Sequence, residues 1–330
     1  MRKGFHRLAE ELIRIVVIVG PTAAGKSDLA VAIARRFGGE IIGADSAQVY
    51  RGLDAATGKP PRADREAIAH HLIDVADPAV DFSAGDYERL ARAAIARVAA
   101  AGRLPIVVGG TGLYLRALLR GLTELPRRDG PIRAALLAWA GRRDAAALHR
   151  MLHALDPEAA RALPAKDTQR IVRAIEVVLA SGRAYSALVA AQPFAADRYR
   201  AIKIGITAPR EVLVRRIEDR VDAFFGEGDL VAEVRGLLAS GVPAAANSLK
   251  ALGYREVMAH LLGGEDLPGT VALVKRNTRR YAKRQLTWFR REPDVVWYAF
   301  RERPEERFAE IVDAIALRME APGESQDGHR

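Results

Sequence analysis

The sequence contains no cysteine, which excludes disulfide bridges, thiolate catalysis and cysteine-ligated zinc sites. It also lacks any apolar run that approaches the ~20 residues needed by a transmembrane helix. The basic N-terminus, MRKGFHRLAEELIR, leads into a polar, helix-like segment without the apolar region of a signal peptide. We therefore expect a cytoplasmic protein that makes no membrane contact, in which residues 1–13 form an extension before the first strand.

Acidic residues are fewer than basic ones, 41 against 51, so the formal net charge is +10 at pH 7. Such an excess is typical of proteins with a polyanionic partner, most often a nucleic acid. A genome that raises arginine content everywhere explains the same composition equally well. With 330 residues the chain is long enough for two compact units rather than one.

A strand, a glycine-rich turn and a helix follow one another near the N-terminus. The apolar run 15–19 ends in a turn that satisfies the pattern G-x-x-x-x-G-K-[ST]. Backbone N–H groups in such a turn surround an anion at the positive end of the next helix. The turn therefore predicts a di- or triphosphate site, although an ordinary strand-to-helix turn that binds nothing is the alternative. The site would consist of Gly20, Pro21, Thr22, Ala23, Ala24, Gly25, Lys26 and Ser27, with the Ser27 hydroxyl as a ligand of Mg²⁺.

Strand and helix patterns alternate along most of the chain, which predicts an α/β fold with a P-loop NTPase-like parallel sheet flanked by helices. Gly20, Asp45 and Gly109 each follow the end of a predicted strand, so we expect them at one edge of the sheet, where ligands bind. Strands are predicted at 15–19, 39–44, 104–108, 201–207 and 295–300, with a short extended piece at 70–75.

Residues 124–198 carry no convincing strand pattern and are predicted to be helical at 132–141, 145–155, 157–163 and 168–180. We interpret this stretch as a helical insertion domain. The catalytic core would then consist of residues 14–123 and 199–320, and residues 321–330 would be a frayed tail.

Residues 275–291, KRNTRRYAKRQLTWFRR, contain eight lysines or arginines and no acid. A stripe at helical spacing that includes Tyr281 and Gln285 is expected to pack inward, which leaves the basic residues on the outer face. Like charges destabilise a helix, so this face indicates an anionic partner such as a phosphate backbone. The alternative is a solvated basic helix, or one neutralised by acids elsewhere. The outer face would present Arg276, Arg279, Arg280, Lys283 and Arg284.

Several stretches between residues 14 and 300 resemble the bacterial tRNA dimethylallyltransferases. In order they read GPTAAGKS, ADSAQVYRGLDAATGKP, HHLID, GGTGLYLRALLRGL, TQRIVRAIEV, LGYRE and TRRYAKRQLTWFR. The resemblance implies transfer of a dimethylallyl group from dimethylallyl diphosphate to the N6 amine of the adenosine 3′ of the anticodon, with Mg²⁺ assistance and release of diphosphate. The partner would be the tRNA anticodon stem-loop, and the chain is expected to act as a monomer.

The resemblance also assigns roles to residues around the phosphate loop. Asp45 matches the general base that accepts a proton from the adenine amine; its alternatives are a Mg²⁺-organising or helix-capping carboxylate. Thr111 matches a threonine near the diphosphate and the target base, with a helix N-cap as its alternative. Lys26, Arg220 and a Mg²⁺ ion held by Ser27 would stabilise the departing diphosphate, and Arg220 is matched only through the stretch RVDAFF.

The target adenine lies in a stacked loop, so it must be flipped out to react. The helical insertion would hold the RNA while the flipped adenine reacts. The resemblance and the basic helix together predict tRNA contacts at Asp45, Ser46, Ala47, Gln48, Thr111, Arg133, Gln169, Arg170, Ile171, Val172, Arg173, Arg279, Arg280, Lys283 and Arg284.

Three other functions remain open at this point. A P-loop small-molecule kinase would share the phosphate loop and turn over ATP without RNA. A prenyltransferase for free adenosine nucleotides would lack the QRIVR insertion. A non-catalytic RNA-binding nucleotide switch would need no carboxylate beside the loop.

Overall fold

A computed structural model describes residues 12–123, 125–143, 146–191, 198–300 and 304–320. The predicted tail and most of the predicted N-terminal extension lie outside these ranges. The chain forms two compact units, one of Met1–Leu119 with Asp197–Arg330 and one of Arg120–Ala196. Within the described residues, no helix combines the length and the apolarity that a membrane span requires.

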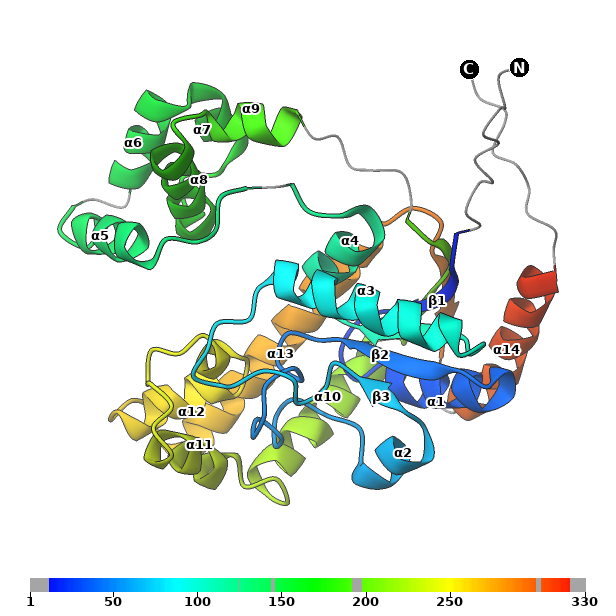
Figure 1. The fold of residues 1–330 in the computed structure, drawn as a ribbon. Coiled ribbons are helices and arrows are strands. Elements are labelled where there is room, and N and C mark those ends of the chain that lie inside the picture. Colours follow the sequence, from blue (N-terminus) through cyan, green and yellow to red (C-terminus); the bar gives the residue numbers. More distant parts are fainter. Residues whose placement is uncertain (1–11, 124, 144–145, 192–197, 301–303, 321–330) are drawn as a thin grey trace, which may run out of the picture. The chain divides into compact units, whose positions relative to one another are not determined.

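The first unit is built on a parallel sheet, which six strands form within the described residues (Figure 1). The strand order is β3-β2-β4-β1-β5-β6, and every neighbouring pair is parallel, as the alternating pattern predicted. The extended piece at 70–75 contributes only two residues, because Leu72 and Asp74 take left-handed φ values of 64° and 57°. The strands are β1 (Arg14–Val19), β2 (Glu40–Ala44), β3 (His70–His71), β4 (Pro105–Gly109), β5 (Arg200–Thr207) and β6 (Val296–Ala299).

Helices cover both faces of this sheet, which explains why its strands read as almost continuous apolar runs. Along β1, Ile15 and Val17 point into one hydrophobic cluster, whereas Val16 and Ile18 point into the other. The first cluster also receives side chains from α3 (Ala84–Ala100), α4 (Gly112–Arg120) and α13 (Leu267–Phe289). The second lies under α1 (Lys26–Phe37) and α14 (Pro304–Glu320), which Figure 1 shows side by side.

Local capping signals set several helix boundaries. Ser83 and Asp86 form a capping box at the start of α3. Helix α13 begins at Leu267, ahead of the basic stretch 275–291, because Asp266 caps the helix and a proline occupies its first turn. The short helix α2 (Arg62–Ala67) was not predicted. Three further helices complete this unit: α10 (Arg210–Phe225), α11 (Leu230–Ala239) and α12 (Tyr254–Leu261).

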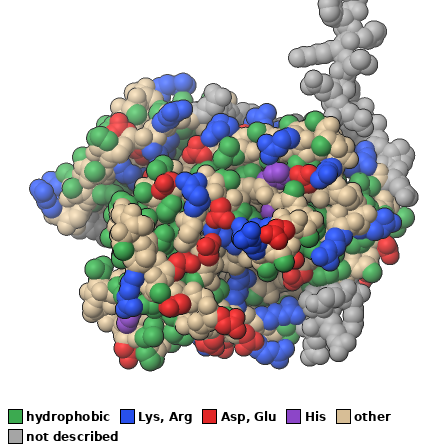
Figure 2. All heavy atoms as spheres, turned by 60° about the horizontal axis from the view of Figure 1, so that its bottom comes forward, with side chains coloured by type: hydrophobic (Ala, Val, Ile, Leu, Met, Phe, Trp, Pro, Cys, Tyr) green, Lys and Arg blue, Asp and Glu red, His purple; other side chains and the backbone are tan. Residues whose placement is uncertain are grey.

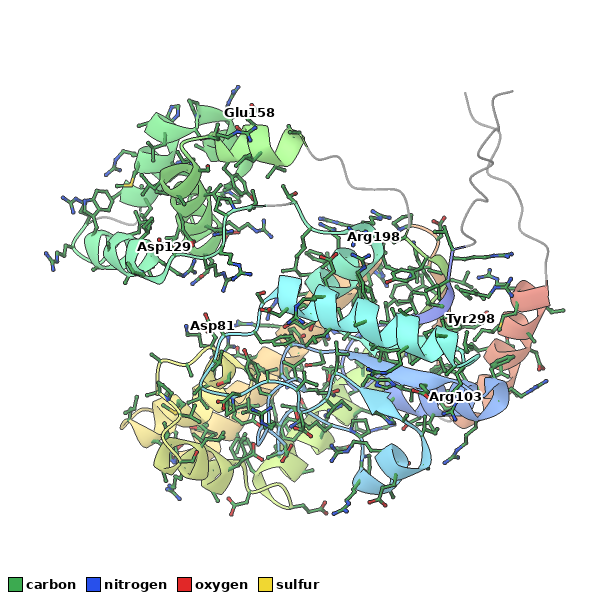
Figure 3. The ribbon with its side chains drawn as sticks, viewed as in Figure 1. Asp81, Arg103, Asp129, Glu158, Arg198 and Tyr298 are labelled. Atoms are coloured by element: carbon green, nitrogen blue, oxygen red, sulfur yellow. The ribbon has the colours of Figure 1, made fainter. Side chains whose placement is uncertain are left out.

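The second unit is helical throughout its described residues and has a hydrophobic core of its own. Leu152 and Ile175 are completely buried in that core. Asp129, labelled in Figure 3, begins the first helix by accepting a hydrogen bond from Ile132 N at 2.9 Å. The helices are α5 (Gly130–Ala140), α6 (Ala147–Leu155), α7 (Pro157–Ala162), α8 (Thr168–Ser181) and α9 (Tyr185–Ala190).

Basic and acidic side chains are interspersed on the face of the molecule drawn in Figure 2. The net positive charge therefore does not form one continuous basic surface on that face. Any basic site has to be located from individual residues.

Candidate active site

Three strands end together at the carboxyl edge of the sheet. Val19 of β1 and Ala44 of β2 are both in register with Gly109 of β4. The next residues of each strand therefore come out at one place, and Thr111 N donates to Ala44 O at 3.2 Å there. The prediction that these three segments meet at one edge is confirmed.

The phosphate loop follows β1 and has the backbone that its glycines allow. A Cβ atom on Gly20 would lie 2.2 Å from Ile206 O, so no larger residue fits between β1 and β5 at that point. Gly25 has a φ of 90° and caps the start of α1. Lys26 Nζ donates to Pro21 O at 2.8 Å, which places the ammonium group inside the turn. This arrangement directs backbone N–H groups and one cation toward an anion.

Lys26, Asp45 and Arg220 form one electrostatic group beside the loop. Burial lowers the pKa of Lys26 to about 8. The negative charge of Asp45 opposes this shift, and the positive charge of Arg220 adds to it. Burial also lowers the pKa of Arg220, and the charges of Asp45 and Asp28 oppose that shift. The structure therefore brings Arg220 to the phosphate loop, although the sequence matched it only through a short stretch on α10.

Asp45 uses one carboxylate oxygen to hold its own turn. Oδ1 accepts from Ala47 N at 2.9 Å and from Gln48 N at 3.4 Å. Oδ2 accepts no hydrogen bond from the described part of the chain. The side chain is half-buried, so it can both brace the backbone and receive a proton.

Thr111 connects the segments that follow β4 and β2. Its Oγ1 accepts a hydrogen bond from Ser46 N at 3.0 Å. The hydroxyl therefore binds the turn that carries Asp45, which places Thr111 beside the candidate base, where the resemblance implied it.

Two side chains of α13 belong to this site but were predicted only as part of an inward-facing stripe. Gln285 is buried, accepts from Thr22 N at 2.8 Å and donates to Gly110 O at 3.0 Å. Tyr281 forms side-chain hydrogen bonds with Thr111 and Gln285, and burial, with the nearby charge of Asp45, raises its pKa. The sequence signal that could have identified them as site residues was an amide and a phenol four residues apart on the inward face of a basic helix.

Gln48 points into the loop that follows it. Its Nε2 donates to Thr57 O at 3.1 Å and to Gly58 O at 2.9 Å. Both amide protons are thereby used within the protein. Only the carbonyl oxygen of Gln48 is left to accept a hydrogen bond from an adenine edge.

The donors at the loop suit a magnesium ion that is bound together with phosphate. Within the described ranges no three histidine, cysteine or acidic side chains gather as a metal site. Mg²⁺ usually keeps several waters and takes substrate phosphate oxygens as ligands, so few protein ligands are needed. Ser27 is exposed in the first turn of α1, where its hydroxyl can supply one of them.

The basic face predicted on α13 is largely exposed. Arg276, Arg280, Lys283 and Arg284 lie open to solvent. Arg279 is only partly exposed, at 38% of its side chain, and is paired with Glu218 of α10. Phosphate groups can therefore reach this face, with Arg279 as its least available member.

The basic residues of the helical unit are held differently. Glu176 is completely buried, with Arg173 Nη1 at 3.0 Å and Arg133 Nη1 at 3.7 Å from its carboxylate oxygens. Both arginine side chains are 22% exposed, and Arg133 also donates to the exposed Gln169. Arg170 is 64% exposed, and its one ion pair within the described ranges is with its neighbour Asp167 at 3.3 Å. Of these residues, Arg170 and Gln169 are the most accessible to a partner.

The structure corrects the prediction for Ile171 and Val172. Both are completely buried in the core of the helical unit. Their apolar side chains stabilise that core and cannot touch a tRNA. Their burial follows from the helical spacing of α8, which turns residues 171 and 172 inward and residues 169 and 170 outward.

Comparison with known proteins gives one consistent result. A family model described as IPP transferase matches residues 48–292. The chain is 50% identical over 291 residues to the tRNA dimethylallyltransferase of Geobacter metallireducens, covering 88% of this chain and 94% of that protein. Identity to the Solibacter usitatus tRNA dimethylallyltransferase is 47% over 283 residues, with 86% and 92% covered.

Solved structures agree. The full-length tRNA isopentenylpyrophosphate transferase from Bacillus halodurans has a TM-score of 0.69 and 38% identity, covering 93% of this chain and 97% of that one. A eukaryotic dimethylallyltransferase, solved while acting on tRNA, has a TM-score of 0.78 and 25% identity, covering 95% and 81%.

Proposed function

The chain belongs to the IPP transferase family, and from that premise we propose that it is a tRNA dimethylallyltransferase. It transfers a dimethylallyl group from dimethylallyl diphosphate to the N6 amine of the adenosine 3′ of the anticodon and releases diphosphate. The relatives that it matches over most of its length are named tRNA dimethylallyltransferase. None of those names favours the alternative of a small-molecule kinase.

One observation carries the assignment of the chemistry: a carboxylate lies within the electrostatic reach of two partly buried cations beside a phosphate loop. Lys26 and Arg220 both respond to the charge of Asp45. A non-catalytic nucleotide switch needs no carboxylate beside the loop, and a small-molecule kinase leaves the basic helix and the helical insertion unexplained. A prenyl transfer to an amine needs both a base and a cationic site for the leaving group.

In the reaction, the N6 lone pair of adenine forms a bond to C1 of the dimethylallyl group. The bond between C1 and the diphosphate oxygen breaks, and its electron pair leaves with diphosphate. The amine then loses a proton. Asp45 Oδ2 is positioned to accept it, because Oδ1 is occupied by the turn.

Charge that develops on the leaving diphosphate is stabilised by groups that are already in place. The N–H groups of residues 23–27 would surround the phosphates, Lys26 would contact them from within the loop, and Arg220 approaches from α10. Ser27 would hold a Mg²⁺ ion at the loop, and that ion would supply further neutralisation of negative charge when bound. Lys26 in particular serves as a cation only while it keeps its proton.

The adenine is placed by groups on the other side of the carboxylate. The Gln48 carbonyl can accept from the amine or its neighbours, and the Thr111 hydroxyl is held within the same turn by Ser46 N. Gln285 ties the phosphate loop to the end of β4, so the two substrates meet on a rigid surface. The exposed basic residues of α13, together with Gln169 and Arg170 of the helical unit, contact the tRNA backbone. The protein acts in the cytoplasm as a monomer.

The test is incorporation of label from dimethylallyl diphosphate into unmodified tRNA in the presence of Mg²⁺. We expect label in the tRNA and release of one diphosphate per transfer, and no turnover of ATP. Lys26→Ala should abolish incorporation. ATP hydrolysis without incorporation would favour the kinase, and incorporation into free adenosine nucleotides but not into tRNA would favour the shorter class of prenyltransferase.

A further inference from the structure

The loop formed by residues 53–59 touches two groups of the active site without supplying a reacting atom. Its carbonyl groups at Thr57 and Gly58 bind the Gln48 amide. The Arg220 guanidinium lies against Gly58, where an added Cβ would fall 1.3 Å from Nη2. The position of this loop therefore decides where the diphosphate-binding arginine and the adenine-binding amide can lie.

Lys59 fixes one end of the loop. Its side chain is only 4% exposed, and Nζ donates to Tyr50 O at 2.8 Å, to Asp54 Oδ1 at 2.6 Å and to Asp74 Oδ1 at 2.5 Å. All three protons of the ammonium group are thereby engaged. These contacts cross-link the loop to the turn after Asp45 and to the segment that follows β3.

Glu233 of α11 holds the same loop from the opposite side. Its carboxylate accepts from Asp54 N at 3.0 Å and from Ala55 N at 2.9 Å, and the Tyr254 hydroxyl donates to it at 2.5 Å. Tyr254 belongs to the LGYRE motif, which has no other assigned task at this site. The loop is thus held by the buried ammonium group of Lys59 and by the carboxylate of Glu233, which leave it little freedom to move.

The turn that carries Asp45 does not depend on Lys59 to the same degree. Backbone hydrogen bonds hold it: Asp74 N donates to Gln48 O at 3.1 Å and Ala76 N donates to Val49 O at 2.8 Å. Thr111 adds its bond to Ser46 N. Loss of Lys59 should consequently displace the 53–59 loop, and Arg220 with it, more than it displaces Asp45.

We propose that Lys59 is a positioning residue for the prenyl transfer, because it holds the 53–59 loop against which Arg220 is seated. This inference rests on the proposed function. Lys59 is too buried and too fully engaged to touch either substrate. It acts through Gly58 on the arginine that stabilises the leaving diphosphate, so its removal should lower kcat while tRNA affinity is kept.

The experiment compares Lys59→Met with Arg62→Met in the labelled tRNA assay. Arg62 is 87% exposed on the neighbouring helix α2 and, among the described residues, pairs only with Glu66, so it is the matched control. We expect kcat of Lys59→Met to fall on the order of 30-fold, since small misplacements of catalytic groups have effects of this size. Its tRNA Kd should stay within about 2-fold of the wild-type value. The control should retain wild-type kcat and Kd.

A double-mutant cycle with Arg220 separates positioning from general damage. In an Arg220→Ala background, Lys59→Met should lower kcat by less than about 3-fold, because the loop then has no arginine to seat. An equal loss in both backgrounds would overturn the proposal, as would a kcat of Lys59→Met within about 3-fold of wild type.

If Lys59→Met does not fold, as judged by its thermal melt, the same cycle is run with Glu233→Gln. That substitution loosens the loop without leaving a buried charge unpaired. Coupling to Arg220 is again expected, and additivity would overturn the proposal. A wild-type protein that incorporates no label would instead refute the proposed function.

Discussion

The carboxyl edge of the sheet and the outer face of α13 both present cations, but the two regions hold them in opposite ways. At the edge, Lys26 and Arg220 are partly buried, and burial lowers their pKa values although the carboxylate of Asp45 opposes the shift. On α13, Arg280 and Arg284 lie open to water. Buried charges at fixed positions can stabilise a transition state, whereas exposed charges on flexible side chains bind a polyanion loosely and in a salt-dependent way.

The helical unit combines both arrangements on one helix. Arg173 is neutralised by the buried Glu176, whereas Arg170, three residues earlier, is exposed. A lysine or arginine count does not distinguish the two. The predictions below test whether buried cations govern the rate and exposed cations govern tRNA affinity.

The largest effect should come from Asp45→Asn. An amide cannot accept the amine proton, so kcat should fall by on the order of 10²-fold or more while tRNA Kd is retained. Single-turnover transfer and filter binding measure the two quantities. Asp219→Asn, an exposed change next to Arg220, is the control and should leave both as they are. A near-normal rate for Asp45→Asn would remove this residue from the role of base.

A second test uses the pKa of Lys26, which burial lowers to about 8. The ammonium form exists below that pKa and is lost above it, so the affinity of the free enzyme for diphosphate should weaken as the pH rises. We expect kcat/KM for dimethylallyl diphosphate to drop roughly 15-fold between pH 8 and 9.5, following the lost proton. The pH profile of kcat/KM is measured at saturating tRNA. A profile that stays level to pH 9.5 would contradict the role of Lys26 as a cation for the diphosphate.

The basic face of α13 should respond through binding instead of rate. Removing Arg280 and Arg284 together, as a double alanine variant, should raise tRNA Kd about 10-fold and reduce the salt slope of binding by about 2. At saturating tRNA, kcat should change less than about 2-fold. Arg35→Ala, an exposed change at the end of α1, provides the comparison. A lower kcat with unchanged Kd would abolish the distinction between the two regions.

The smallest effect is expected in the helical unit. Arg170→Ala should weaken tRNA binding about 3-fold without changing the thermal melt, because its partner Asp167 is also accessible to water. Arg161→Ala, exposed on α7 of the same unit, is the control and should leave Kd unchanged. Equal affinities for both variants would show that α8 does not contribute to tRNA binding.

Much of the sheet and of the phosphate loop followed from local sequence. The alternation of apolar strands with helices predicted a parallel sheet, and the ends of β1, β2 and β4 predicted where the site lies. Three features were not predicted from the sequence. Leu72 and Asp74 interrupt the extended piece after β3 with left-handed φ values. Asp266 moves the start of α13, and burial removes Ile171 and Val172 from the tRNA-binding set.

By itself, the sequence determined which chemistry is available: a loop for phosphate, a carboxylate at a strand end and a basic helix. These are local patterns, because the geometry of each depends on neighbours within a few residues. Only the tertiary structure decided which distant side chains complete the site. Gln285 meets Thr22 across 263 positions of the chain, and Lys59 and Glu233 fix the loop against which Arg220 lies. Such contacts arise from the packing of α10, α11 and α13 at the sheet edge, which no local pattern records.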